Sequence, residues 1–512
     1  MNGAELLLRT AVEQGVEVCF ANPGTTEMEL VGALDCVPGM RGVLGLFEGV
    51  VTGAADGYGR VTGRPALTLV HLGPGFANGI ANLHNARRAH TPVVNLIGDH
   101  ASWHAHADAP LTSDIESLAG PVSSHVERVV GASHMGSAVL EAIAASIGPP
   151  SGVATLIVPQ DAAWGAADLH DVGMLPDVEP SVAADDVGAA ASKLRGGDGV
   201  AILLGGVVRR AELEAAQRIA EDTGAKVWVD TFPAVLEQGR GLPRFEALPY
   251  FPEQAIDALA GVRTLICAGT KSPVAFFGYQ SVGRSDLLDD ACDVVELCPP
   301  GTRGHLGLDA LVDALGCAQA SVADRPEAAV PTGDLDMFTM GQLVAALQPE
   351  GAIVVNEAAT SGLGWAMGAG GAPPHESFSL TGGAIGQGLP CAVGAAVAAP
   401  GRKVIALQAD GSGLYTLQSL WTMAREGLDV TVVVCANRAY RILQMELHRT
   451  GNDDPGPMAR SLTDLGSPEL DWVSLAKGFG VDGMQATTLD ELRAGLGRGL
   501  ATDGPFLVEA LI

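Results

Sequence analysis

One short stretch near the C-terminus constrains the fold of this chain more than any other. An apolar run at 403–407 leads to Asp410, which stands among glycines. A helix is expected over 414–425, and a second apolar run from 432 ends at the amide Asn437, 27 positions after Asp410. Strands and helices that alternate in this way predict a parallel sheet. The carboxylate and the amide are therefore expected at the tips of neighbouring strands.

This pair of oxygen ligands suits a hard divalent cation that grips a diphosphate. Mg²⁺ prefers oxygen ligands and usually completes its shell with substrate phosphates. The glycines beside the acid let backbone N–H groups approach those phosphates at a helix N-terminus. The stretch therefore predicts a magnesium and diphosphate site in an α/β protein.

Composition agrees with that fold class and excludes one class of partner. A chain of 512 residues is too long for one core, and its 67 glycines are typical of an α/β protein with many tight strand–helix turns. The net charge of −29 argues against nucleic acid, because phosphate backbones are bound through Lys and Arg.

The cysteines and the apolar runs indicate a cytoplasmic protein with no membrane partner. The eight cysteines form no CxxC pair, so free thiols in a reducing compartment are favoured over disulfides. No apolar run approaches the roughly 18 residues that a membrane span needs. No basic leader precedes the first apolar stretch, so no signal peptide is expected.

Two stretches rich in Ala, Asp and Pro, at 171–184 and 318–335, predict linkers. We predict domains at 1–168, 185–318 and 337–512, each with a doubly wound parallel sheet. Helices are expected at 4–14 and 210–222. The strands are expected at 18–21, 65–71, 92–98 and 153–159, then at 199–204, 226–229, 264–268 and 293–297, and finally at 352–355, 403–407, from 432 and at 505–511.

The pair Gly205-Gly206 follows the first strand of the middle segment. It favours a plain turn over a dinucleotide-binding loop, because the full GxGxxG spacing is absent and no ribose-binding acid is obvious. A nicotinamide- or flavin-dependent oxidoreductase is therefore a poor fit.

The spacing of Asp410, its glycines and Asn437 resembles the thiamine diphosphate (ThDP) signature. Nearly the whole chain resembles the ThDP-dependent 2-oxo acid decarboxylases and acetolactate synthase large subunits, with benzoylformate-decarboxylase-like enzymes closest. The resemblance implies pyrimidine-binding, central and diphosphate-binding domains in the ThDP-binding fold, with ThDP and Mg²⁺ as cofactors. It implies that the metal ligands are Asp410, Asn437 and the carbonyl of Ala439, and that Gly411, Ser412 and Tyr440 lie near the phosphates.

The segment 46–48, followed by 53–60, resembles the family's strand end that carries the activating glutamate. The resemblance implies that Glu48 hydrogen-bonds N1′ of the aminopyrimidine. That bond favours the imino tautomer, whose 4′-nitrogen removes the thiazolium C2 proton. The alternative is an ordinary glutamate at a helix N-terminus.

Two further segments resemble active-site loops of the family. Thr25, in 20–27, matches a hydroxyl that faces the substrate; the alternative is that Thr25 or Thr26 caps a helix. His71 matches a proton-handling histidine and lies 23 residues after Glu48, at the end of an expected strand. The alternative for His71 is a purely structural role.

The C-terminal segment carries two more matches. Residues 381–390 resemble the loop that holds the cofactor between its rings, with Gly383 and Ile385 as cofactor contacts. Ile385 matches a bulky wedge that forces a V-shaped cofactor and brings the 4′-nitrogen close to C2. Residues 356–361 resemble a turn that contacts the diphosphate through Thr360.

Four positions depart from the family pattern. Ala409 replaces the first glycine of the signature, which is tolerated unless the residue needs φ > 0. Ala436 replaces the first of two asparagines. Arg438 and Arg441 stand where small residues are more usual and add positive charge beside the diphosphate or substrate.

The resemblance implies a lyase or transferase that decarboxylates a 2-oxo acid and then releases an aldehyde or adds the enamine to a second carbonyl. Active sites at the interface of a homodimer or homotetramer are implied. FAD and branched-chain acetolactate synthesis are not expected, because the chain ends straight after 505–511. The aromatic pair at 276–277 favours an aromatic or medium-sized substrate, and Gln280 is a further candidate contact.

Two other readings stay open. One is a catalytically silent or regulatory acetolactate synthase paralogue, which the retained Glu48 argues against. The other is a ThDP-dependent hydrolase or lyase that cleaves a carbon–carbon bond in a diketone or an acyl-CoA.

Overall fold

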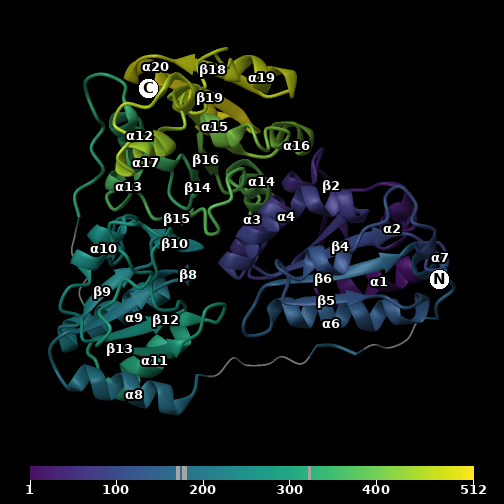
Figure 1. Ribbon diagram of the computed structural model, residues 1–512, viewed down its shortest axis with the longest axis horizontal. Coiled ribbons are helices and arrows are strands. Elements are labelled where there is room, and N and C mark those ends of the chain that lie inside the picture. The colour runs from purple at the N-terminus through teal and green to yellow at the C-terminus, as the bar shows by residue number, and fades with distance from the viewer. Residues whose placement is uncertain (169–172, 176–181, 321–324) are drawn as a thin grey trace.

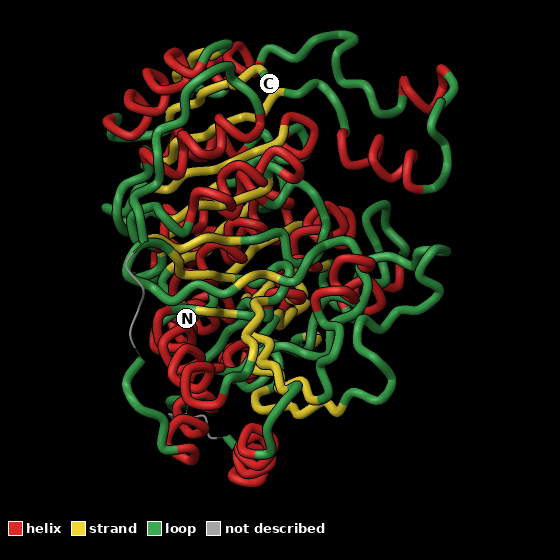
Figure 2. Tube along the Cα trace, turned by 90° about the vertical axis from the view of Figure 1, so that its left-hand side faces the viewer, coloured by secondary structure: helices red, strands yellow, loops and turns green. Residues whose placement is uncertain are grey.

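The computed structural model describes residues 1–168, 173–175, 182–320 and 325–512. Within them lie three sheets of mainly parallel strands, and helices cover both faces of the strands (Figures 1 and 2). The N-terminal, middle and C-terminal segments occupy the purple-to-blue, teal and green-to-yellow parts of Figure 1. The parallel α/β fold expected from the sequence is confirmed.

The first sheet has six parallel strands in the order β2-β1-β3-β4-β6-β5. The strands are β1 (Val18–Asn22), β2 (Arg41–Leu44), β3 (Ala66–His71), β4 (Val93–Asp99), β5 (His125–Arg128) and β6 (Val153–Pro159). The helices are α1 (Gly3–Glu13), α2 (Met28–Cys36), α3 (Glu48–Thr62), α4 (Leu72–Ala89), α5 (Ile115–Ala119), α6 (Met135–Ile147) and α7 (Gln160–Trp164), with 3₁₀ turns η1 (Thr25–Glu27), η2 (Ala105–Ala107) and η3 (Ala132–His134).

A core on each face of this sheet explains why its central strands are apolar throughout. Val94 and Leu96 of β4 belong to the core with α1 and α6, whereas Val93 and Ile97 belong to the core with α3. A strand buried on both faces reads as a continuous apolar run rather than an alternating one.

The middle sheet has the order β11-β9-β7-β12-β13, with all neighbours parallel. Its strands are β7 (Val200–Leu204), β9 (Lys226–Val229), β11 (Glu246–Ala247), β12 (Thr264–Ala268) and β13 (Asp293–Cys298). The helices of this segment are α8 (Ala184–Arg195), α9 (Arg210–Thr223), α10 (Pro252–Ala258) and α11 (Gly304–Leu315).

The third sheet has eight strands in the order β18-β19-β17-β16-β14-β15-β10-β8. The strands are β8 (Val207–Val208), β10 (Val235–Gln238), β14 (Ile353–Glu357), β15 (His375–Phe378), β16 (Val404–Ala409), β17 (Val430–Ala436), β18 (Asp482–Ala486) and β19 (Phe506–Leu511). The helices are α12 (Met337–Leu347), α13 (Leu363–Ala369), α14 (Gly388–Ala398), α15 (Asp410–Gly413), α16 (Ser419–Glu426), α17 (Arg441–Arg449), α18 (Pro457–Ser461), α19 (Trp472–Gly478) and α20 (Leu489–Ala501), with the 3₁₀ turn η4 (Ala359–Gly362).

Two strands of the third sheet come from the middle segment, which the sequence did not indicate. β10 pairs antiparallel with β15, and β8 pairs with β10. Side chains reinforce the pairing: Gln238 Nε2 donates to Ser377 Oγ at 3.0 Å, and Arg209 Nε donates to Glu376 Oε1 at 2.7 Å. The turn at Gly205-Gly206 therefore leads into β8 before α9 begins.

Helices α3 and α14 join the N-terminal and C-terminal segments at very short range. Every residue from Glu48 to Arg60 of α3 is buried, as is α14 from Gly388 to Val397. A Cβ built on Gly57 would lie 2.0 Å from the carbonyl oxygen of Cys391, so this close approach of backbones requires glycine.

The expected strands are confirmed to within two residues. The helix expected over 414–425 is confirmed from Ser419 onward as α16, but residues 414–418 are not helical. Within that stretch the Thr416 hydroxyl donates to the carbonyl of Gly386 at 2.9 Å. The expected linkers at 171–184 and 318–335 fall partly outside the described residues. All eight cysteines are free, and no helix in the described ranges has the length and apolarity for a membrane span.

Candidate active site

The structure brings Asp410 and Asn437 to the same edge of the third sheet. β16 and β17 are parallel neighbours, with Ala409 opposite Cys435. Asp410 follows the end of β16, and Asn437 follows the end of β17. Thr360, in η4 just after β14, lies at the same edge, because β14 is the other neighbour of β16.

The Asp410 carboxylate is 2% exposed and accepts hydrogen bonds only from backbone groups in the described chain. Its Oδ1 accepts the N–H of Gly411 at 2.9 Å, and its Oδ2 accepts the N–H of Arg438 at 2.6 Å. The Arg438 guanidinium pairs instead with Glu469, at 2.9 Å. Burial raises the pKa of Asp410, and these hydrogen bonds oppose that shift. The nearby charge of Arg438 also lowers the pKa of Asp410, but no cationic side chain contacts the carboxylate in the described chain, which fits a bound divalent cation.

The remaining donors are an amide and a backbone carbonyl. Asn437 Oδ1 accepts the N–H of Ala439 at 2.9 Å, which fixes the loop that carries both groups. Within the described ranges, no three His, Cys, Asp or Glu side chains group as metal ligands. One carboxylate, one amide and one carbonyl would leave about half of an octahedral Mg²⁺ shell for phosphate oxygens and water.

Gly411 and Tyr440 form a tightly packed part of this edge. A Cβ on Gly411 would lie 2.4 Å from the Tyr440 ring, so only glycine fits there. Ser412 is buried, and its hydroxyl accepts the Gln408 amide at 2.6 Å. Ala409 has φ of −75°, so alanine is tolerated without strain where the family has glycine.

The wedge loop, residues 381–388, is held by hydrogen bonds on both sides of Ile385. Asn85 Oδ1 accepts the N–H of Ala384 at 3.2 Å, and Asn85 Nδ2 donates to the Ala384 carbonyl at 2.7 Å. Gly386 donates its N–H to Glu357 at 2.7 Å, and its carbonyl accepts Asn82 at 3.2 Å. The backbone beside Ile385 is therefore fixed, as a residue that shapes a cofactor requires.

Glu357 is a buried carboxylate to which the sequence analysis gave no role. Its two oxygens accept the N–H groups of Gly386, Gln387 and Gly388, and Gln408 Nε2 donates at 2.9 Å. Burial raises the pKa of Glu357, while those hydrogen bonds oppose the shift. A negative charge also suits this position at the N-terminus of α14. The sequence feature that could have indicated a role for Glu357 is its position at the end of an apolar strand.

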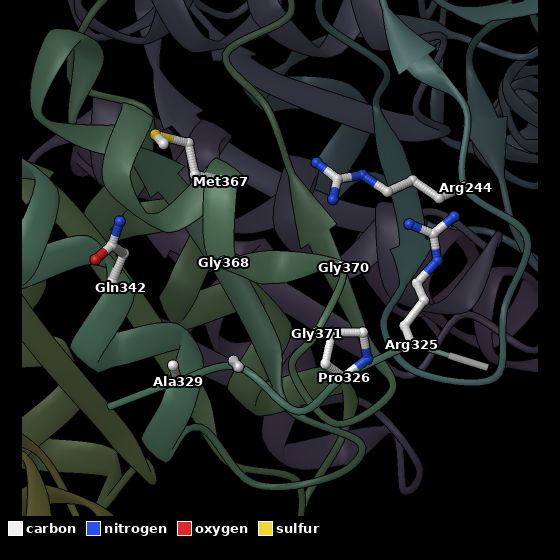
Figure 3. A pocket seen from close by; sticks show the side chains of 10 residues that line it. Arg244, Arg325, Pro326, Ala329, Gln342, Met367, Gly368, Gly370 and Gly371 are labelled. Carbon is white, nitrogen blue, oxygen red and sulfur yellow. The ribbon is translucent and has the colours of Figure 1, made fainter. Parts of the chain in front are cut away.

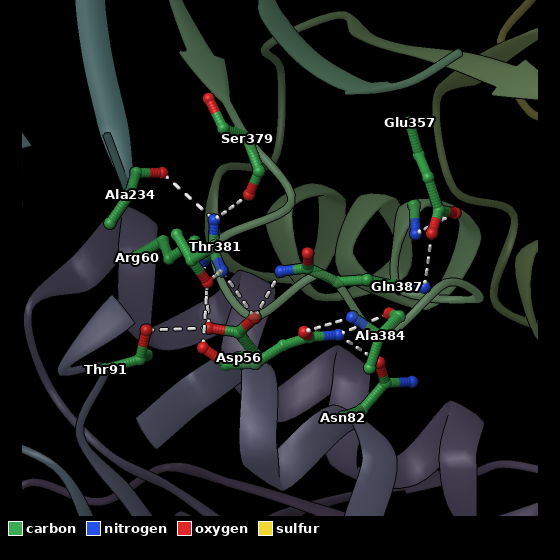
Figure 4. Close-up of polar contacts among 12 residues, drawn as sticks. Asp56, Arg60, Asn82, Thr91, Ala234, Glu357, Ser379, Thr381, Ala384 and Gln387 are labelled. Atoms are coloured by element: carbon green, nitrogen blue, oxygen red, sulfur yellow. Dashed lines mark hydrogen bonds and ion pairs between the residues drawn. The ribbon is translucent and has the colours of Figure 1, made fainter. Parts of the chain in front are cut away.

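A second buried network ties the wedge loop to α3 (Figure 4). Arg60 forms a two-pronged ion pair with Asp56, at 2.9 and 2.8 Å, and also donates to the carbonyls of Ala234 and Ser379. Gln387 Nε2 donates to Asp56 at 2.6 Å. One arginine thus joins the N-terminal, middle and C-terminal segments. Neither Asp56 nor Arg60 was assigned a role from the sequence.

Glu48 is the first residue of α3 and lies four positions beyond the end of β2, so the expectation of a strand end was wrong. The residue is 9% exposed, and its Oε2 accepts Asn78 Nδ2 at 3.1 Å. A Cβ on Gly75 would lie 3.0 Å from Glu48 Oε1 and 3.3 Å from His71 Cβ. Glu48 Oε1 and the Cβ of His71 therefore both lie against Gly75.

His71 is part of a cluster with Glu27, Thr26 and Gly24. His71 Nδ1 lies 2.8 Å from Glu27 Oε2 and 3.1 Å from Thr26 Oγ1. Glu27 is fully buried, and a Cβ on Gly24 would lie 2.3 Å from the imidazole. Thr25 is exposed, and its neighbour Thr26 makes the contact with His71. Neither Glu27 nor Thr26 was predicted from the sequence as a partner of this histidine.

Backbone strain gathers beside the candidate residues. In the described chain, the non-glycine residues with positive φ are Leu72, His90, Asp108, Ala359 and Arg438. Leu72, Ala359 and Arg438 each directly adjoin a candidate residue: His71, Thr360 and Asn437. Such conformations cost on the order of 1–3 kcal/mol each and gather at functional sites.

An aromatic cluster from the middle segment reaches the wedge loop. It comprises Phe232, Tyr250, Phe251, Phe276, Phe277 and Tyr279, with neighbouring ring centroids 5.0–6.5 Å apart. A Cβ on Gly383 would lie 2.8 Å from the Phe276 ring, so Phe276 packs directly on the loop. Phe276 and Gln280 are both exposed, and Phe276 contacts the loop at Gly383.

Comparison with known proteins agrees with this geometry. Residues 1–118 match the family model "Thiamine pyrophosphate enzyme, N-terminal TPP binding domain", and residues 364–510 match the corresponding "C-terminal TPP binding domain". The chain thus carries both binding domains of a ThDP-dependent enzyme.

Two similar proteins define more closely which ThDP-dependent enzymes this chain belongs with. The chain is 48% identical over 517 residues to the "Putative acetolactate synthase large subunit IlvX" of Mycobacterium tuberculosis, covering 100% of this chain and 99% of the relative. It is 29% identical to the benzoylformate decarboxylase of Pseudomonas aeruginosa, over 97% and 96% of the two chains. The chain belongs to the ThDP-dependent enzyme family of acetolactate synthases and 2-oxo acid decarboxylases.

The fold is shared with solved structures. The ThDP-dependent 4-hydroxybenzoylformate decarboxylase of Rhodococcus jostii RHA1 superposes with a TM-score of 0.86 at 23% identity. That likeness covers 100% of this chain and 99% of the other.

Proposed function

We propose that this ThDP-dependent enzyme also requires Mg²⁺ and decarboxylates a 2-oxo acid with an aromatic or other large apolar side chain, releasing an aldehyde. The observation that carries the proposal is the convergence of Glu48, His71 and Glu27. The proposed activating carboxylate and the Cβ of a histidine that pairs with a buried acid both lie against Gly75. Decarboxylation followed by protonation needs this combination.

We assign a separate role in cofactor binding to each group of candidate residues. Asp410, Asn437 and the Ala439 carbonyl would hold Mg²⁺, with Gly411, Ser412, Thr360 and Tyr440 around the diphosphate. Gly383 and Ile385 would fit between the cofactor rings, and Glu48 would hydrogen-bond the aminopyrimidine N1′. ThDP, when bound, supplies the nucleophilic carbon and the electron sink that make loss of CO₂ possible.

His71 is proposed to move the proton that completes the reaction. An ionised carboxylate can only accept a hydrogen bond. The Nδ1 atom of His71 therefore carries the proton and donates to the buried Glu27 carboxylate. This fixes the ring and leaves Nε2 to exchange a proton with the substrate-derived group. Thr25 remains a proposed substrate contact, from the exposed side of the same turn.

The aromatic cluster supports the substrate class. It places Phe276 against the wedge loop in a chain of only 4% aromatic residues. Aromatic side chains present large apolar surfaces that pack edge-to-face with other rings. The names of two similar proteins, benzoylformate decarboxylase and 4-hydroxybenzoylformate decarboxylase, accord with an aromatic substrate.

The test is turnover of a panel of 2-oxo acids by the protein loaded with ThDP and Mg²⁺, with CO₂ and aldehyde both measured. Benzoylformate is expected to exceed pyruvate in kcat/KM by roughly tenfold or more, as discrimination through a hydrophobic pocket allows. Magnesium removal should abolish turnover. Absence of CO₂ release from every acid would contradict the proposal.

A second candidate is ligation of the kind that acetolactate synthases perform, favoured by the name of the 48% identical relative. Acetolactate from pyruvate, with little free aldehyde, would support it. A silent paralogue would bind ThDP without turnover, and a carbon–carbon hydrolase would cleave a diketone or an acyl-CoA in the same panel.

The broader setting is proposed as well. We expect a cytoplasmic homodimer or homotetramer with domains at 1–168, 185–318 and 337–512 and shared active sites. FAD is not part of the proposal. At the carboxyl edge of the middle sheet, a Cβ on Gly205 would lie 2.5 Å from Thr270, so two loops pack against each other where a nucleotide would bind.

A further inference from the structure

A cavity of about 390 Å³ lies between the middle and C-terminal segments. Arg244, Arg325, Gln342 and Met367 line it, and none of the candidate active-site residues does. Figure 3 shows both arginine side chains on one side of the space, with Met367 and Gln342 on the other.

The two arginines have no partner in the described chain. Neither forms an ion pair or a side-chain hydrogen bond there, and Arg325 Nε is buried without a partner. Glu327, two residues beyond Arg325, pairs with Arg240 at 3.3 Å instead. The chain has 59 acidic and 30 basic residues, so an arginine pair without a carboxylate goes against its composition. An unpaired buried donor of a charged group is costly unless a ligand satisfies it.

Glycine makes room for the pair. A Cβ on Gly370 would lie 2.6 Å from Arg244 Nη1, and one on Gly371 would lie 2.9 Å from the Pro326 carbonyl. The N–H of Ala328 donates to the Gly371 carbonyl at 2.8 Å, which holds the two segments together. The cavity is therefore walled by fixed backbone on the side of the arginines.

We infer that this cavity binds a phosphate-bearing small molecule, at a site separate from the active site. Guanidinium groups match phosphate oxygens through paired N–H donors, and two of them neutralise a doubly charged phosphate. Met367, which is 60% exposed, offers an apolar wall for the organic part of the ligand. Gln342 offers an amide beside it.

A purely structural role for the arginines, at the C-terminal end of α13, explains fewer of these observations than a bound phosphate does. Arg244 lies over Gly370, directly after α13, where a cation interacts favourably with the last carbonyls. This accounts for one arginine. It leaves the buried Nε of Arg325 and the open space between the two groups unexplained.

The test is calorimetric titration of the holoenzyme, saturated with ThDP and Mg²⁺ so that phosphate cannot occupy the cofactor site. The probes are phenyl phosphate and inorganic phosphate. One site per chain is expected, with phenyl phosphate the tighter ligand because its ring reaches Met367. Arg244→Gln and Arg325→Gln should each weaken binding roughly tenfold or more, as loss of a charge-assisted hydrogen bond predicts.

Three further variants provide a control and two tests of the binding site that do not remove Arg244 or Arg325. Arg493→Gln removes an exposed, unpaired arginine in α20 and should change binding less than about twofold. Gly370→Ala displaces Arg244 while both charges remain, and Met367→Glu adds a repelling carboxylate from an exposed position. Both should weaken binding, even if the arginine variants fail to fold. No binding by the wild type, or the same loss in Arg493→Gln, would overturn the inference.

Discussion

At the residue scale, the decisive feature is the pairing of His71 with a fully buried glutamate. Glu27 receives the N–H of Gly24 at 2.6 Å and the Thr26 hydroxyl at 2.5 Å, besides His71. Its position is therefore fixed on several sides. A carboxylate held in this way orients the imidazole of His71.

The first prediction concerns that pair. Glu27→Gln keeps the size of the side chain but removes the charge, so kcat for benzoylformate should fall about tenfold to a hundredfold, up to the lower end of general acid–base effects. The affinity for ThDP, measured by calorimetry, should stay within about twofold, because Glu27 is not a proposed cofactor contact.

The matched control is Glu13→Gln, an exposed acid of α1. It should leave both kcat and ThDP affinity unchanged. Wild-type kcat in Glu27→Gln would show that the buried acid plays no part in proton transfer.

A second prediction concerns Glu357, which accepts four N–H donors. In Glu357→Gln the new NH₂ group would face donors, so at least one buried N–H loses its acceptor. We expect a loss of about 1–3 kcal/mol in the free energy of unfolding. Denaturant unfolding would measure it, with the exposed Glu350→Gln as the control; an unchanged midpoint would contradict the role given to these bonds.

How far the sequence predicts such residues depends on how local their partners are. Asp410 and Asn437 were placed correctly at one edge, because each follows an apolar run and parallel strands bring their ends together. Asp56 pairs locally with Arg60, but its contact with the wedge loop could not be predicted, since Gln387 lies 331 positions away. Glu27 stood within a recognised motif, but its partner His71 is 44 positions away.

At the element scale, burial decides which strands can be predicted. β14, β16 and β17 are continuous apolar runs buried on both faces, and the sequence predicted each of them. β2 and β18 are short and partly exposed, so their residues carry no such run. β10 escapes prediction because it pairs across segments with β15, and β8 has only two residues.

Helix α17 is held to the middle segment mainly by one side chain. It has no buried residue. Arg449 forms two hydrogen bonds with Glu253, at 2.9 and 3.0 Å, and lies 4.3 Å from the centre of the Phe251 ring. Tyr279 donates to Glu446 at 3.1 Å. Because α17 follows directly after Tyr440, its position bears on the cofactor edge.

The third prediction is that Arg449→Ala releases this helix. Amide hydrogen exchange over 441–449 should rise by about tenfold, because the ion pair and two cation–π contacts are lost together. The melting temperature should change little, since α17 contributes no buried surface. Arg210→Ala, in the exposed part of α9, should leave exchange at 441–449 unaltered; equal exchange in both variants would show that Arg449 does not hold the helix.

At the scale of the whole molecule, the question is which chain completes which site. No hydrogen bond in the described chain joins Glu48 to Ile385, Asp410 or Asn437, whereas α3 and α14 lock the N- and C-terminal segments of one chain together. The proposed arrangement completes each site with Glu48 from one chain and the magnesium ligands from another. Two inactive variants can test it.

The fourth prediction uses Glu48→Gln and Asp410→Ala, each expected to abolish turnover as a homo-oligomer. Co-expressed with different tags and purified as a mixed dimer, they should recover about half of the wild-type activity per dimer, because one of two sites then pairs an intact Glu48 with an intact Asp410. If each site lay within one chain, every site would carry one defect and the mixed dimer would stay inactive. A tagged mixture of wild type with Glu48→Gln, also expected near half, controls for the effect of the tags. Recovered activity would therefore assign the two halves of the site to different subunits, since no rearrangement within a single chain restores both residues.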